Sequence, residues 1–342
     1  MPTHVIAAYV SDMTVIGYLG HFYHLYVLGS FILGLLFGSF LNVCISRLPE
    51  HESIVHPRSH CPCCGHAVRA YDNIPILSFF LLRARCRDCK TKISWRYPAV
   101  ETATGLWFAV LVVQWFTSQS YSTGIRSLVS YAMERDISPG LWISNGMSVL
   151  VPAILGFLLI GLMVMDWQTQ RLPDAFTLTG IGVGFLLLCA RAFFLAPGEG
   201  DIVLNTTHQL RMSSPGSSLA QGNVFLTGTE AMVLGRVAAI CGAALILLVV
   251  RWLYKAACKR DGMGLGDVKL LSMIAAFLGF SQSLFALMIG VLAAAVYGVA
   301  LLAFRKAGKE TKLPFGSFLA AGGLFAAVFG ARVVEWYVGL LR

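Results

Sequence analysis

The hydrophobic positions of this chain gather into long stretches separated by polar connections. Apolar residues run roughly through 22–46, 98–117, 147–165, 175–196, 231–254, 267–281, 283–304 and 314–341. A helix needs about 20 apolar residues to cross a bilayer. Most stretches have that length, but 267–281 is short, and its end at Gly279 predicts a tight hairpin with the next stretch. The pattern therefore predicts an all-α polytopic membrane protein with about eight transmembrane helices.

Composition supports a membrane location. Hydrophobic residues make up 57% of the chain and charged residues 13%, with a mean hydropathy of +0.72. These values lie far from the balance of a soluble domain, so we expect the protein to be surrounded by membrane lipid. Roughly the first 20 residues contain no Lys or Arg and include Asp12, so they lack the basic start of a cleavable signal peptide. We interpret them as an uncleaved tail.

Basic residues are distributed unevenly along the chain. Most of the 26 Lys and Arg fall in alternate connections: in 47–96, at Arg171, in 251–269 and in 305–312. Because short cytoplasmic loops collect basic residues, these connections are predicted to be cytoplasmic and both termini extracytoplasmic. The net charge of +9 has the same origin: basic residues on one side orient the chain in the membrane and attract anionic lipid. No nucleic-acid module is found, and we expect no nucleic-acid partner.

The polar segment from Arg47 to Tyr97 contains two pairs of cysteines in C-x2-C spacing. Four thiolates in this arrangement suit a tetrahedral structural zinc site, which would largely hold so small a segment together. Cys63 is left over, and His60 or His66 could replace a sulfur ligand. Disulfides or a redox pair are the alternatives, although a cytosolic location argues against stable disulfides. The predicted metal ligands are Cys61, Cys64, Cys86 and Cys89.

Two aspartates lie at the ends of apolar segments. Asp166 closes the apolar run 148–165, and Asp267 closes a glycine-rich run that begins at Gly262. A carboxylate at a membrane boundary loses hydration, so chains avoid it unless a partner or a reaction requires it. Two carboxylates brought together share one proton, as an aspartyl protease requires. The pair therefore predicts a membrane aspartyl peptidase, with two structural carboxylates paired to basic residues as the alternative.

Other residues near the aspartates have predicted roles. Gly262, Gly264 and Gly266 are expected to adopt positive φ and to let an extended peptide lie beside Asp267. Asp174 is expected to cap the helix that follows it, and Lys269 either tunes the aspartate pair, binds an anionic part of the substrate or only orients the chain.

Several spaced motifs together resemble the type IV prepilin peptidases, a family of GxGD membrane aspartyl proteases. The motifs are Gly38-Ser-Phe-Leu-Asn-Val43, Arg47-Leu-Pro49, both cysteine pairs, Arg96-Tyr-Pro98 with Glu101, Asp166 with Leu172-Pro-Asp174, Gly264-Leu-Gly-Asp267 with Lys269, and Pro314-Phe-Gly316. The resemblance implies that Asp166 and Asp267 are catalytic. It implies cleavage of the short basic leader of type IV prepilins or pseudopilins at the cytoplasmic face of the bacterial inner membrane. It also implies N-methylation of the new terminus with S-adenosylmethionine.

These interpretations divide the chain into a tail with a first helix (1–46), a cytosolic zinc-binding segment (47–97) and a transmembrane peptidase domain (98–342). Glu101 either contacts the basic leader or pairs with an arginine. We expect the zinc-stabilised segment to help build the pocket for the methyl donor. The rival functions are a peptidase without methylation and a proton-coupled membrane transporter, although we see no repeat of the kind transporters show.

Overall fold

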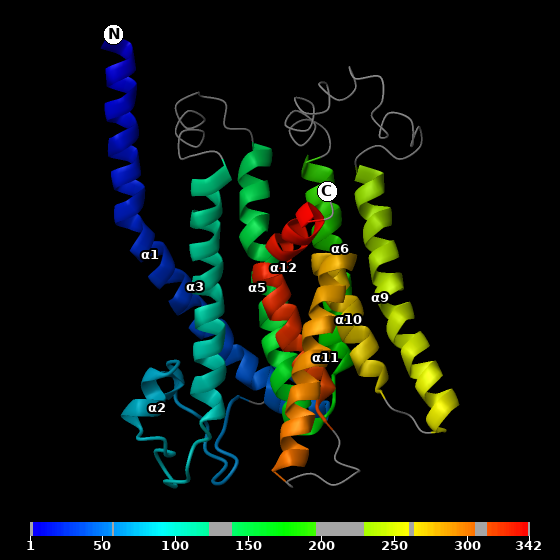
Figure 1. Ribbon diagram of the computed structural model, residues 1–342. Coiled ribbons are helices and arrows are strands. Elements are labelled where there is room, and N and C mark those ends of the chain that lie inside the picture. Colours follow the sequence, from blue (N-terminus) through cyan, green and yellow to red (C-terminus); the bar gives the residue numbers. More distant parts are fainter. Residues whose placement is uncertain are drawn as a thin grey trace. The chain divides into compact units, whose positions relative to one another are not determined.

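The computed structural model describes residues 3–56, 58–122, 139–195, 229–259, 263–304 and 313–340. Within these ranges the regular structure is helical, and the only strand-like pairings are two isolated bridges. The chain divides into two compact units, Met1–Pro139 and Gly140–Arg342. Figure 1 shows the helices of both units.

The first unit is built on two long helices, α1 (Thr3–Arg47) and α3 (Arg96–Ser122), which lie side by side (Figure 1). Glycines let their backbones approach closely. A Cβ atom at Gly38 would lie 2.7 Å from the Cα of Glu101, and one at Gly34 would lie 2.7 Å from the Cα of Gly105. Between the helices the chain forms three short helices: η1 (Leu48–Glu50), η2 (Ala70–Asn73) and α2 (Leu77–Leu81).

The second unit packs its helices around a short central one. α10 (Leu265–Leu278) is buried along nearly all of its length and contacts helices on several sides (Figure 1). Its apolar residues face neighbours all round, so α10 is a core helix of the bundle. The helices of this unit are α5 (Pro139–Thr169), α6 (Asp174–Leu195), α9 (Thr229–Cys258), α10, α11 (Phe280–Ala303) and α12 (Phe315–Leu340).

The predicted all-α polytopic fold is confirmed, since each of the eight apolar stretches forms a helix. In the described part of the chain, six helices are long and apolar enough to cross a membrane. α10 has 14 residues, about 21 Å of helix, which is less than the roughly 30 Å thickness of a bilayer core. Gly279, at φ +90°, separates α10 from α11, where the hairpin was predicted.

The predicted division of the chain into three parts, with boundaries after residues 46 and 97, stays a prediction. The predicted extracytoplasmic connections, 118–146 and 197–230, fall largely outside the described residues.

Candidate functional site

The two aspartates come together in the second unit. Asp166 lies in the last turn of α5 and Asp267 in the first turn of α10, and their side chains are almost fully buried at 5% and 8% exposure. The carboxylates are close enough for the charge of Asp166 to act on Asp267. No basic side chain is paired with either of them among the described residues. Two buried carboxylates without a counter-ion are expected to hold a proton between them.

Ser317, in the first turn of α12, holds the Asp166 carboxylate. Its backbone N–H donates to Asp166 Oδ2 at 2.7 Å, and its hydroxyl lies 3.1 Å from the same oxygen. The first N–H groups of a helix have no partner within the helix, so an anion from another helix satisfies them well. The hydroxyl also lies 2.8 Å from the carbonyl oxygen of Met163, one turn before Asp166. Ser317 therefore joins the start of α12 to the end of α5.

Leu172, in the connection between α5 and α6, packs against the first turns of α10 and α12. A Cβ atom at Gly266 would lie 3.0 Å from the side chain of Leu172, and so would one at Gly316. A Cβ at Gly316 would also lie 3.1 Å from the Asp166 Cγ. Both glycines are therefore needed for close packing, which brings the first turns of α10 and α12 up to the connection between α5 and α6.

The expectation of positive φ in the glycine-rich run was wrong for the residues the structure describes. Gly264 is the N-cap of α10 with φ −73° and ψ 153°, an extended conformation, and Gly266 lies within α10. Neither is among the residues with positive φ, and Gly262 lies outside the described residues. Gly266 allows close packing within the chain, because Leu172 fills the place of its missing side chain. The expectation that an extended peptide lies beside Asp267 stays a prediction. Gly264 is exposed beside the Asp267 carboxylate.

Lys269 pairs with Asp174. The Lys269 Nζ lies 2.6 Å from the Asp174 Oδ1, which joins the first turn of α10 to the start of α6. The predicted capping role of Asp174 needs correction: α6 begins at Asp174 itself, and the carboxylate bonds to Lys269 across the bundle. At the first helical position its charge still favours the positive end of the helix.

The four predicted metal ligands converge in the first unit. The sulfur atoms of the four cysteines lie within 4.8 Å of one another, and Cys61 and Cys89 are 3.7 Å apart. Ligand sulfurs at the corners of a tetrahedron around zinc, each about 2.3 Å from the ion, lie roughly 3.8 Å apart. The leftover Cys63 is exposed. The cluster is formed by Cys61, Cys64, Cys86 and Cys89, and it could bind zinc.

The two cysteine pairs form nearly identical turns. The N–H of Cys61 donates to the carbonyl of His66, and the N–H of Cys86 donates to that of Thr91. Gly65 and Lys90, each directly after a second cysteine, both have positive φ. The Thr91 side chain and backbone lower the pKa of the Cys89 thiol to about 6. Repeated turns, each with two thiols directed into one cluster, form a scaffold suited to binding a metal ion.

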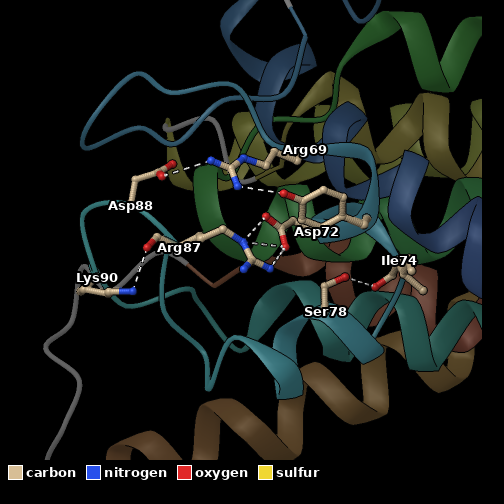
Figure 2. Close-up of polar contacts among 8 residues, drawn as sticks. Arg69, Asp72, Ile74, Ser78, Arg87, Asp88 and Lys90 are labelled. Carbon is tan, nitrogen blue, oxygen red and sulfur yellow. Dashed lines mark hydrogen bonds and ion pairs between the residues drawn. The ribbon is translucent and has the colours of Figure 1, made fainter.

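An ion pair connects the second cysteine turn to the segment between the pairs (Figure 2). The Arg87 Nε lies 2.9 Å from the Asp72 Oδ2, and a second guanidinium nitrogen reaches Oδ1. This two-pronged bond holds the pKa of the Asp72 carboxyl below its usual value. Arg87 also lies over the ring of Tyr71, and Arg69 donates to the hydroxyl of Tyr71. The zinc-binding segment is thus cross-linked by side chains as well as by its cysteines.

Glu101 lines a cavity of about 490 Å³ within the first unit. It is 8% exposed, and its Oε2 accepts a hydrogen bond of 2.7 Å from the backbone N–H of Ile76. The predicted arginine partner is not found among the described residues; the carboxylate instead joins α3 to the zinc-binding segment. The cavity lies among the end of α1, the start of α3 and the cysteine turns.

Sequence reasoning missed two residues that the structure places at these sites. Asn42 is 2% exposed and lines the cavity; its Nδ2 donates to the carbonyl of Tyr97, while its Oδ1 has no partner in the described part of the chain. Ser317 contacts Asp166. Asn42 lies within the motif Gly38–Val43 and Ser317 directly follows Pro314-Phe-Gly316, but neither was assigned a role; an asparagine inside an apolar helix is itself a signal. Their contacts depend on helices distant in sequence.

Two family profiles match the chain: the bacterial peptidase A24 N-terminal domain over residues 32–115 and the type IV leader peptidase family over residues 217–299. A prepilin leader peptidase/N-methyltransferase of Pseudomonas putida is 30% identical over 335 residues, which cover 91% of this chain and 93% of that relative. This chain belongs to the type IV leader peptidase family.

Further leader peptidases support the assignment. Relatives with the same name are 28% identical in Aeromonas salmonicida (strain A449), covering 91% of this chain and 93% of the relative, and 29% identical in Pseudomonas aeruginosa, covering 95% and 98%. No solved structure gave a significant match. The first profile spans the four cysteines and Glu101, the second spans Asp267, and Asp166 lies between them. Membership of this leader peptidase family does not favour the transporter alternative.

Proposed function

We propose that this protein removes the short basic leader of type IV prepilins or pseudopilins and then N-methylates the new terminus. The observation that carries the peptidase half is the pair of buried carboxylates, Asp166 and Asp267, brought together from the ends of two helices with no counter-ion among the described residues. One carboxylate takes a proton from water while the water oxygen attacks the peptide carbonyl. The other donates a proton to the carbonyl oxygen. The carbon–nitrogen bond then breaks as the nitrogen is protonated.

The test is direct cleavage by the purified full-length protein. A prepilin-like peptide with a basic leader and an apolar segment should be cut at a single bond, and S-adenosylmethionine should add one methyl group to the new amine. Mass spectrometry reads both products. Cleavage without methylation would leave the peptidase alone, and an uncut peptide would refute the proposal.

We propose a structural zinc ion bound by the four cysteines of the first unit. Support comes from the converging sulfurs and the matched turns. When bound, zinc would fix both turns, and with them the walls of the neighbouring cavity. The four cysteines lie within the range of the A24 N-terminal profile, whereas Asp267 lies within that of the leader peptidase profile, so we assign the metal to structure and not to peptide cleavage.

The cavity beside Glu101 is our proposed site for the methyl donor. S-adenosylmethionine carries a sulfonium and an ammonium group, and cations in a buried site need acceptor oxygens. The cavity offers the Glu101 carboxylate and the Oδ1 of Asn42, which has no hydrogen-bond partner among the described residues. A volume of about 490 Å³ lies in the range of small-molecule sites. When bound, S-adenosylmethionine would supply a methyl group, and Glu101 and Asn42 would hold its cationic end.

Glu101→Gln should weaken S-adenosylmethionine binding at least about fivefold, because the amide loses the negative charge but keeps an oxygen acceptor for Ile76. Equilibrium dialysis with labelled S-adenosylmethionine measures the dissociation constant without any turnover. Glu52→Gln is the matched control, since Glu52 lines the same cavity but is exposed. Unchanged affinity in Glu101→Gln with intact metal content would place the donor elsewhere.

We further propose that the protein lies in the bacterial cytoplasmic membrane with both termini outside the cytoplasm. The sidedness of the basic residues supports this orientation. A cysteine introduced at Leu340, which is exposed near the end of α12, should be labelled on intact cells by a membrane-impermeant maleimide. Cys63, also exposed, should be labelled only after the membrane is opened. The opposite pattern, read by peptide mass spectrometry, would invert the topology.

A further inference from the structure

Asp166 and Asp267 differ in the hydrogen-bond donors that surround them. Asp166 Oδ2 faces two donors of Ser317, the backbone N–H at 2.7 Å and the hydroxyl at 3.1 Å. Asp267 makes no such pair of bonds among the described residues, and the only donor near its carboxylate there is the backbone N–H of Gly264, the N-cap of its own helix. Ser317 is itself 3% exposed, so water does not compete for these bonds. The two carboxylates are therefore not equivalent.

A donor favours the ionised form of the carboxylate it contacts. The N–H of Ser317 cannot accept a hydrogen bond, so it stabilises only an Oδ2 that carries no proton. It also belongs to the first turn of α12, where the helix dipole favours negative charge. Because two adjacent buried carboxylates share a single proton, stabilising one anion leaves the proton on the other carboxyl.

We propose that Ser317 is a positioning residue that keeps Asp166 as the ionised member of the pair, so that Asp166 is the base and Asp267 starts the reaction protonated. The inference rests on the proposed peptidase function. With Oδ2 occupied by Ser317, the Oδ1 of Asp166 remains to receive the proton of the attacking water. Gly316 makes this arrangement possible, since a Cβ there would lie 3.0 Å from Asp166 Oδ2.

The proton count closes over one cycle. Asp166 takes a proton from water as the water oxygen bonds to the peptide carbon, and Asp267 gives its proton to the carbonyl oxygen. Asp166 then passes its proton to the nitrogen as the carbon–nitrogen bond breaks, and Asp267 recovers a proton from the hydroxyl as the carboxyl product forms. Both aspartates end as they began, and no other reactant is needed.

The Ser317 hydroxyl can follow this change. It carries a single proton but lies within reach of two acceptors, Asp166 Oδ2 and the carbonyl of Met163. While Asp166 is ionised the hydroxyl donates to it, and when Asp166 is protonated the hydroxyl is free to donate to Met163. The contact with the Met163 carbonyl on α5 keeps the Ser317 side chain in place whether Asp166 is ionised or protonated.

Few other charges act on this pair in the described residues. The elements packed around Asp166 contribute Asp267 and Lys269 from α10, Asp174 from the start of α6 and Arg171 from the connection before it. Lys269 is bound to Asp174. The first turn of α12 carries no acidic residue and the last turn of α11 no basic one, while α9, which packs on α10, carries Lys255 in its last turn. A shift in the pH profile on changing Ser317 thus reports on the aspartate pair.

The decisive experiment compares Ser317→Ala, Ser317→Thr and Ser272→Ala in the purified full-length enzyme. Ala removes only the hydroxyl, so kcat should fall about tenfold with KM changed less than about twofold. The acidic limb of the kcat–pH profile should move upward by about half to one pH unit, because a less stabilised anion holds its proton to higher pH. Thr keeps the hydroxyl and should restore kcat to within about threefold of the original.

Ser272→Ala is the matched control. Ser272 is a buried serine of α10 whose hydroxyl bonds to the carbonyl of Val268 in its own helix, so its loss should leave the pH profile unchanged. An acidic limb that stays in place in Ser317→Ala, or moves downward, would overturn the inference. A wild-type protein that cuts no peptide would instead refute the proposed function, and the two failures are thereby distinguished.

Discussion

Asp166→Asn and Asp267→Asn are each expected to reduce peptide cleavage by on the order of a thousandfold or more. An amide can neither take a proton from water nor give one to the carbonyl oxygen. The double variant should be scarcely slower than either single one, because residues that act as a unit do not contribute additively. Rates of product formation measured by mass spectrometry with purified variants test this expectation.

The control for the aspartate variants is Asp174→Asn. Asp174 also begins a helix of the second unit, but its side chain is 61% exposed and bonds to Lys269. Its loss should lower the rate by less than about tenfold, since an exposed ion pair contributes little. Near-normal cleavage by Asp166→Asn or Asp267→Asn, in protein that is inserted in the membrane and folded, would remove the catalytic assignment.

The second large effect is expected from the cysteine cluster. Purified protein should contain about one zinc per chain, and Cys61→Ser combined with Cys86→Ser should lose it, because each turn then keeps only one thiolate. Cys63→Ser should retain the metal, as Cys63 is exposed and outside the cluster. Metal analysis of the purified variants decides between these outcomes. Full activity in metal-free protein would show that the cysteines serve another purpose.

The same double variant should separate the two activities. Both cysteine turns that this variant changes line the cavity beside Glu101, whereas the aspartate pair belongs to the other unit. Methylation should therefore fall by more than about tenfold while cleavage falls much less. Conversely, Asp166→Asn should still methylate a peptide supplied already cleaved. Equal loss of both activities in the cysteine variant would mean that the zinc-binding segment supports the whole fold.

Different physical signals explain which features could be predicted from the sequence. Hydrophobic length predicted where helices lie, because a bilayer imposes a minimum span on each one. Cysteine spacing predicted the metal ligands, since a C-x2-C turn fixes two sulfurs locally. The roles of Lys269 and Glu101 stayed open at that stage. Their partners, Asp174 and the backbone of Ile76, lie on other segments of the chain.

By itself, the sequence determined the helical membrane architecture, the two cysteine turns and the two aspartates at the ends of apolar runs, because each is a local pattern of polarity or spacing. Only the tertiary structure decided that α10 is a buried core helix, that Ser317 binds Asp166 and that the Oδ1 of Asn42 lacks a partner among the described residues around its cavity. These features arise where helices distant in sequence pack together. The packing of these helices decides which donor bonds to which carboxylate, and no short sequence motif contains that information.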